Sequence, residues 1–164
     1  NYSTGMFHMW LPAMGMVNPY ITFLDPDPFT TIVSPGNVVP VVTTAAYQAP
    51  SNALYNYSSR GFTPFNDVKP DITAPGVDLT VPKPMGGYGT ATGSSIAGAF
   101  AAGCAALVAQ WGMSLKPKRY FSSNEIKAYF IRGAVRNPVL TYPNREWGYG
   151  ILNVYQVFGV FLSP

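Results

Sequence analysis

The fold of this chain is decided by the stretch Gly93-Ser94-Ser95-Ile96-Ala97-Gly98-Ala99-Phe100-Ala101-Ala102-Gly103, in which a Gly-Ser-Ser turn runs into an apolar segment of mostly Ala and Gly. This pattern predicts a buried helix that opens at the turn and ends near Trp111, with Gly112 as its C-cap. The first N–H groups of a helix lack intrahelical acceptors, and the helix dipole makes that end positive. A serine hydroxyl there can act as a nucleophile while the N–H groups stabilise an oxyanion. The alternative is that the serine serves only as the helix N-cap.

Composition limits the class of protein. The 164 residues fit one domain. With 48% hydrophobic and 10% charged residues, against the usual share of about 25% charged, the chain is not disordered, and part of its surface is expected to be covered. The single cysteine, Cys104, excludes a disulfide framework and a cysteine-only metal site. We expect Cys104 to be a small buried core residue and the protein to need no cofactor.

Charge and hydropathy argue against two kinds of partner. The net charge is +3, and the one local basic cluster, Lys116, Lys118 and Arg119, flanks Pro117. We interpret it as a solvated loop and not as a nucleic-acid site. The uncharged run Ile96–Ala109 is shorter than the roughly 20 residues needed to cross a membrane, so we expect a buried helix and no membrane span.

The start of the chain carries no sign of a signal peptide. Residues 1–5 have neither a basic nor an apolar region, and no Met begins the sequence. We therefore expect a fragment or a processed piece of a longer protein.

Other segments predict strands alternating with helices. Residues 1–36 are expected to be irregular or β-rich. The expected elements are a strand at Phe7–Leu11, a buried strand at Val38–Ala46, a hairpin or extended segment at Asn52–Tyr57, short strands at Asp71–Gly76 and Val77–Val81, a Pro/Gly loop at Pro82–Gly87, a helix at Glu125–Gly133 opened by a Ser122/Glu125 capping box, and a closing helix at Ile151–Phe161. This order favours an α/β architecture with a mostly parallel sheet.

Four segments, in order, resemble the C-terminal part of the subtilisin-like serine proteases over residues 37–158. They are Asn37–Ala46, Tyr57–Gly61 with Lys69-Pro70-Asp71-Ile72-Thr73-Ala74-Pro75-Gly76, Gly93–Ala97, and Trp147–Val154. The resemblance implies that the fold is the C-terminal portion of a subtilisin-like parallel-sheet core.

Three further segments resemble clostridial members, which include the germination-specific proteases of spores. They are Phe7–Pro12, Asp25–Thr31 and Tyr142–Trp147. In that group a β-sandwich (jelly-roll) insert precedes the core strand. The resemblance therefore implies that residues 1–30 are the β-rich tail of such an insert and residues 31–164 the C-terminal part of the catalytic domain. It also implies an extracytoplasmic location, secreted or spore-associated.

The resemblance assigns roles to individual residues. Ser95 takes the position of the nucleophile, and its backbone N–H, supported by the Ser94 hydroxyl, takes part in the oxyanion hole. His8, the only histidine, stands in a Phe-His-Met-Trp context unlike that of the family's base, so we expect it not to be catalytic. Asp71 is expected to be structural and to bind nearby backbone. No metal ligands are assigned.

The family's Asp, His and oxyanion-hole Asn are expected upstream of residue 1. The implied function is therefore the nucleophile-bearing part of a serine endopeptidase, inactive alone, which hydrolyses peptide bonds of a protein or peptide substrate through an acyl-enzyme at Ser95. Its expected partner is the N-terminal part of the same protease. Two alternatives are a pseudoprotease scaffold or sensor and a glycan-binding module.

Overall fold

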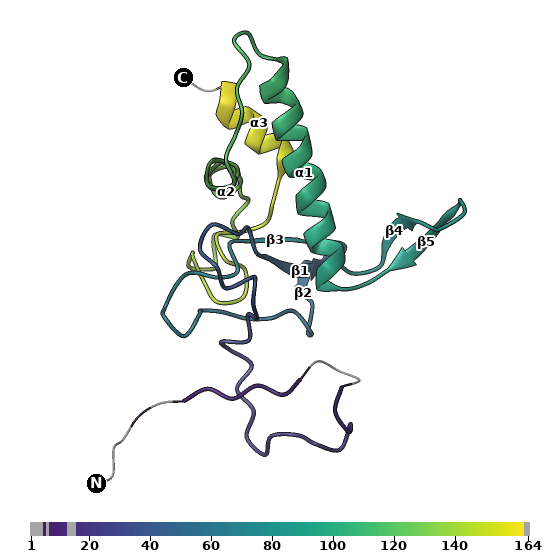
Figure 1. Cartoon of the computed structure of the whole chain (residues 1–164), viewed down its shortest axis with the longest axis vertical. Helices are drawn as coiled ribbons and strands as arrows, with labels where there is room; N and C mark the ends of the chain where they lie inside the picture. The colour runs from purple at the N-terminus through teal and green to yellow at the C-terminus, as the bar shows by residue number, and fades with distance from the viewer. Residues whose placement is uncertain (1–4, 6, 13–15, 163–164) are drawn as a thin grey trace.

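The computed structural model describes residues 5, 7–12 and 16–162. Its elements are β1 (Thr44–Gln48), β2 (Ala53–Leu54), β3 (Ile72–Pro75), β4 (Leu79–Pro82), β5 (Tyr88–Ala91), α1 (Ser94–Ser114), α2 (Ser123–Arg132) and α3 (Val154–Leu162). Figure 1 shows the helices gathered at one end of the molecule, with α1 running down to the small central sheet and the N-terminal segment extending away from it.

The central sheet confirms the predicted α/β architecture. Its strand order is β2-β1-β3, with β1 parallel to β3 and antiparallel to β2. The strand expected at Val38–Ala46 begins only at Thr44, because residues 34–41 form successive turns and Pro40 has no N–H to donate to a ladder. The extended segment expected at Asn52–Tyr57 is reduced to the two residues of β2.

The long helix α1 covers β1 and β3 with a face of small residues. Ala97 packs with Ala46 and Ala74, and further along Cys104 and Val108 enter the main core. The absence of large side chains lets the helix backbone approach the sheet closely. Cys104 is buried, as expected, and burial raises the pKa of its thiol.

The prediction that Gly112 caps α1 is wrong. The helix continues through Gly112 to Ser114 and ends at Leu115, which is extended. A Cβ on Gly112 would lie 2.4 Å from the carbonyl oxygen of Arg119 and 2.6 Å from the ring of Phe121. Glycine is needed here for close packing and not for a left-handed turn.

The two shorter helices complete the main core. The Ser122 hydroxyl accepts a hydrogen bond from the Glu125 N–H at 3.3 Å, and a Glu125 carboxylate oxygen accepts one from the Ser122 N–H at 2.9 Å, so the predicted capping box is confirmed. The Ser122 backbone bond also lowers the pKa of Glu125. The closing helix starts at Val154 and not at Ile151, because Ile151 forms bridges to Thr73 and Val135.

We expect Ser122→Ala to lower the free energy of unfolding by about 1 kcal/mol, the usual contribution of an N-cap serine. Thermal or denaturant unfolding of the intact protein measures this. Ser123→Ala, one residue further into α2, is the matched control. Equal losses in both variants would contradict the capping role.

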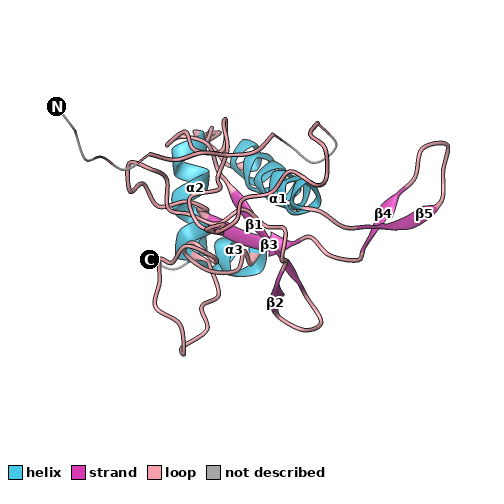
Figure 2. Cartoon of the chain, turned by 90° about the horizontal axis from the view of Figure 1, so that it is seen from below, coloured by secondary structure: helices cyan, strands magenta, loops and turns pink. Residues whose placement is uncertain are grey.

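The hairpin of β4 and β5 forms a separate two-stranded sheet that protrudes from the body (Figure 2). The strand expected at Val77–Val81 is shifted to Leu79–Pro82, and β5 was not expected from the sequence. The Gly87-Tyr88-Gly89 context of β5 is typical of a loop, and only pairing with β4 makes it a strand.

The N-terminal segment differs from its expectation. No strand forms in the described residues before Thr44, so the strand expected at Phe7–Leu11 is wrong, and of the two expectations for residues 1–36 the described part is irregular. Trp10 instead anchors the segment through a hydrogen bond of 2.8 Å from its indole N–H to the carbonyl oxygen of Thr30. That residues 1–30 belong to a jelly-roll insert stays a prediction.

Candidate active site

Ser95 lies in the first turn of α1, at the end of the sheet to which β1 and β3 point. The Gly93 N–H donates to the carbonyl oxygen of Gly76 at 2.8 Å, and the Gly76 N–H donates to that of Tyr47 at 3.0 Å. These two backbone hydrogen bonds connect the start of α1 to the ends of β1 and β3. The position of Ser95 is therefore set by the parallel sheet.

Position 76 has no room for a side chain unless this turn moves. A Cβ on Gly76 would lie 2.8 Å from the Cβ of Ala46 and 2.9 Å from the carbonyl oxygen of Gly93. Both are rigid parts of the fold, so a side chain would displace the turn that carries Ser95.

We expect Gly76→Ala to reduce the peptide turnover that the resemblance implies for the intact protein by about 10²-fold, the cost of displacing a reacting group by roughly 1 Å. Turnover of a fluorogenic peptide measures the effect. Gly159→Ala in α3 is the control, because a Cβ there meets nothing within 4 Å. Unchanged turnover in Gly76→Ala would show that the turn tolerates this shift.

Neither serine of the turn caps the helix. The N-cap residue is Gly93, and no side chain makes a capping hydrogen bond. The alternative that a serine here is only an N-cap is therefore wrong. As the first residues of α1, Ser94 and Ser95 carry N–H groups that the helix leaves without acceptors. Their hydroxyls are exposed, which leaves Ser95 open to attack a substrate.

A groove of about 560 Å³ runs past the two serines. One wall is the start of α1, and the opposite wall is the loop before β1 with the first residue of that strand. The lining residues are Ile32, Val33, Ser34, Pro35, Gly36, Val41, Val42, Thr43, Thr44, Ser59, Ser94, Ser95 and Gly98. A peptide chain placed in this groove would pass beside the Ser95 hydroxyl.

No base lies at Ser95 in the described part of the chain. No described hydrogen bond joins Ser95 to a histidine or a carboxylate. The ring of His8 stacks on that of Trp10, with centroids 5.7 Å apart, in a segment far along the chain from the turn of Ser95. The sequence-predicted residues that the structure brings together are thus Ser94 and Ser95 only.

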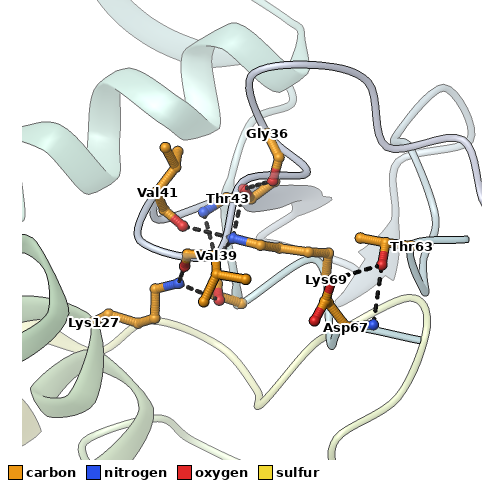
Figure 3. Close-up of polar contacts among 9 residues, drawn as sticks. Gly36, Val39, Val41, Thr43, Thr63, Asp67, Lys69 and Lys127 are labelled. Carbon is orange, nitrogen blue, oxygen red and sulfur yellow. Dashed lines mark hydrogen bonds and ion pairs between the residues drawn. The ribbon is translucent and has the colours of Figure 1, made fainter. Parts of the chain in front are cut away.

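Asp71 is structural, as expected. One of its carboxylate oxygens accepts a hydrogen bond of 2.7 Å from the Thr43 N–H. The same oxygen pairs with the Lys69 amine at 2.7 Å, and the other pairs with Lys127 at 3.0 Å. Figure 3 shows the two lysine amines converging below the loop that precedes β1.

The two lysines were missed by sequence reasoning. Residues two apart in an extended segment share a face, so the spacing of Lys69 and Asp71 could have indicated their pairing. No local pattern indicates Lys127, which reaches the cluster from α2.

Of the basic cluster Lys116, Lys118 and Arg119, the structure fixes Arg119 by side-chain contacts on the surface. The Arg119 guanidinium pairs with Glu125 at 3.2 Å and lies 4.7 Å above the ring of Phe121, and its pKa is raised chiefly by the hydrogen bond to Glu125. Within the described residues, no three His, Cys, Asp or Glu side chains gather where they could hold a metal ion.

The Gly-Ser-Ser turn and the parallel sheet lie within a region that matches a known family of proteins. Residues 24–150 match the model of the subtilase family of peptidases, so the chain belongs to the subtilase family. No curated protein matches the chain.

Solved structures show the same fold. The CspB protease of Clostridium perfringens has 29% sequence identity and a TM-score of 0.80 over 86% of this chain and 31% of its own. The prenylagaramide maturation protease PagA has 23% identity and a TM-score of 0.66, with 81% and 46% covered. The self-cleaved protease domain of PatA has 23% identity and a TM-score of 0.62, with 79% and 44% covered. The chain thus spans less than half the length of each of these proteases.

Proposed function

We propose that this chain is the nucleophile-bearing part of a serine endopeptidase that hydrolyses protein or peptide substrates. The observation that carries the proposal is the exposed Ser95 hydroxyl at the start of α1, on a turn that backbone hydrogen bonds tie to the parallel sheet. Membership of the subtilase family and the groove beside Ser95 support it.

The chemistry follows from this placement. The Ser95 Oγ attacks the carbonyl carbon of the scissile bond, and a base takes its proton. The Ser95 N–H at the positive end of α1 binds the resulting oxyanion, with Ser94 in support. The C–N bond then breaks, the base returns the proton to the leaving amine, and water hydrolyses the ester on Ser95.

The base must come from outside residues 1–164 in this proposal. His8 is held against Trp10, and Asp71 is occupied by two lysines and a backbone N–H. We propose that the N-terminal part of the same protease supplies the His, its orienting Asp and an oxyanion-hole Asn.

The part of β1 that β2 does not reach supports such a partner. Successive strand residues direct their backbone groups to opposite edges. The carbonyl oxygens of Thr43 and Tyr47 bond toward β3, whereas Ala46 faces the other edge and is bound by residues 55–58. Thr44 faces the same edge as Ala46, beyond the reach of β2. A further strand can pair there, next to the groove.

The outer face of α1 supports the same partner. Phe100, Leu107 and Met113 are 42%, 48% and 49% exposed, although α1 is mostly apolar. By length and composition alone, α1 is also suited to cross a membrane, a test that core helices of soluble proteins pass too. Its other face packs on β1 and β3. We therefore propose that the rest of the protease covers the outer face and that α1 is no membrane span.

A fluorophosphonate probe on the intact protein tests the proposed function. We expect one covalent label, mapped by mass spectrometry to Ser95, and we expect no peptide turnover by residues 1–164 alone. A folded intact protein that is not labelled would overturn the proposal and favour a pseudoprotease scaffold or sensor.

The resemblance to clostridial members supports an extracytoplasmic, secreted or spore-associated location, which cell fractionation tests.

A further inference from the structure

The loop before β1 forms one wall of the Ser95 groove but has little regular structure of its own. Residues 37–41 form turns and bends, and the backbone N–H groups of Val38 and Val41 donate only to the carbonyl oxygens of Pro35 and Val38 nearby. Val41, Val42 and Thr43 line the groove opposite the nucleophile turn. The shape of this wall therefore depends on what holds the loop from behind.

Two lysines hold it, of which Lys69 is buried and Lys127 is largely covered. The Lys69 amine donates to the carbonyl oxygen of Val41 at 2.6 Å, and the Lys127 amine donates to that of Val39. These are the only described hydrogen bonds from residues 37–42 to any other element. Figure 3 shows both amines reaching the underside of the loop, Lys69 from the segment before β3 and Lys127 from α2.

Asp71 connects the two lysines and the first residue after the loop. Its two oxygens pair with Lys69 and Lys127, and one of them also accepts the Thr43 N–H. The side chains are 2% exposed for Lys69, 5% for Asp71 and 14% for Lys127. Two ammonium groups face one carboxylate, so the remaining positive charge is stabilised by the carbonyl oxygens of the loop.

We propose that Lys69, Asp71 and Lys127 form a positioning cluster that sets the substrate-binding wall of the Ser95 groove. This inference rests on the proposed peptidase function. None of the three residues lines the groove, but Lys69 and Asp71 bond to the groove-lining residues Val41 and Thr43, so the cluster acts through the loop. Burial lowers the pKa of Lys69, and the neighbouring Lys127 lowers it further, while the hydrogen bond and charge of Asp71 oppose that shift. Releasing the loop should weaken peptide binding and leave the chemistry at Ser95 intact.

Lys127→Met in the intact protein is the decisive variant. It removes the hydrogen bond to Val39 but leaves one lysine opposite one carboxylate, so the buried cluster becomes neutral and the fold should survive. We expect KM for a peptide substrate to rise about tenfold with kcat within about twofold of wild type, the pattern of lost uniform binding. Labelling of Ser95 by a minimal fluorophosphonate should keep its wild-type rate, because that probe needs no groove wall.

Two control variants define the result. Arg132→Met removes one positive charge from the exposed end of the same helix and should leave KM unchanged. Lys127→Arg keeps a cationic donor and should restore part of the lost affinity. A KM unchanged in Lys127→Met, a KM raised equally by Arg132→Met, or equal losses of peptide turnover and minimal-probe labelling would overturn the inference.

Amide hydrogen exchange tests the same step without turnover. In Lys127→Met, peptides covering residues 37–43 should exchange faster than in wild type, while those covering the Ser95 turn should not change. Unchanged exchange at residues 37–43 would overturn the inference even in an active enzyme. A wild-type protein in which Ser95 is not labelled would instead overturn the proposed function, and with it the substrate role of the cluster.

Discussion

Ser95→Ala in the intact protein is expected to abolish both fluorophosphonate labelling and peptide turnover. Without the Ser95 hydroxyl no acyl-enzyme can form, and only weak stabilisation by the helix N–H groups remains. In subtilisin, a member of the same family, the nucleophile contributes about 10⁶-fold to kcat. A loss of that order would put residual turnover below detection in an ordinary fluorogenic assay.

Two serines of the same helix serve as controls for this variant. Ser114 lies at the other end of α1, where its hydroxyl donates to the carbonyl oxygen of Trp111, so Ser114→Ala should keep full activity. Ser94→Ala should be slower but still labelled, because Ser94 only supports the oxyanion site. Labelling that survives Ser95→Ala would show that another residue is the nucleophile.

Asp71→Asn is expected to have the largest effect on stability. Among the described residues, Asp71 is the one carboxylate paired with the amines of Lys69 and Lys127, so the substitution leaves two cations, one of them buried, without a counter-charge. Breaking a buried ion pair in this way costs about 3–5 kcal/mol. Urea unfolding of the intact protein should show the loss, or the variant should fail to accumulate in folded form.

Two variants separate this effect from a general loss of a carboxylate. Asp67→Asn changes a partly exposed side chain that bonds to Thr63, and should cost no more than about 1 kcal/mol. Asp71→Asn combined with Lys127→Met should be more stable than Asp71→Asn alone, because one of the unpaired cations is gone. Additive losses in the double variant would show that the charges do not interact as the contacts indicate.

Local patterns predicted those features whose physical cause lies within a few residues. The capping box of Ser122 and Glu125 was predicted because a serine and a glutamate three residues apart satisfy each other's backbone N–H groups. The helix after Ser95 and the buried Cys104 were predicted for a similar reason, since a long apolar run of small residues favours a helix packed closely on its neighbours. The helix is buried on one face only, and its other face is exposed in the described structure.

Local patterns were wrong where distant contacts decide the outcome. Gly112 has the sequence context of a C-cap, yet the approach of Arg119 and Phe121 explains it as a packing position inside α1. β5 exists because β4 pairs with it, although its own residues are typical of a loop. The expected strand at Phe7–Leu11 has no partner strand in the described structure, and an isolated strand is not stable.

The sequence by itself determined the parallel α/β class, the nucleophile candidate at Ser95 and the structural role of Asp71, because each depends on neighbouring residues or on family motifs. Only the tertiary structure decided what surrounds Ser95: the backbone hydrogen bonds of Gly76, the groove, and the loop wall held by Lys69 and Lys127. Those contacts join residues from β1, β3, α1 and α2 that are far apart in the chain. No periodicity or spacing encodes such distances, since only the packed fold brings these groups together.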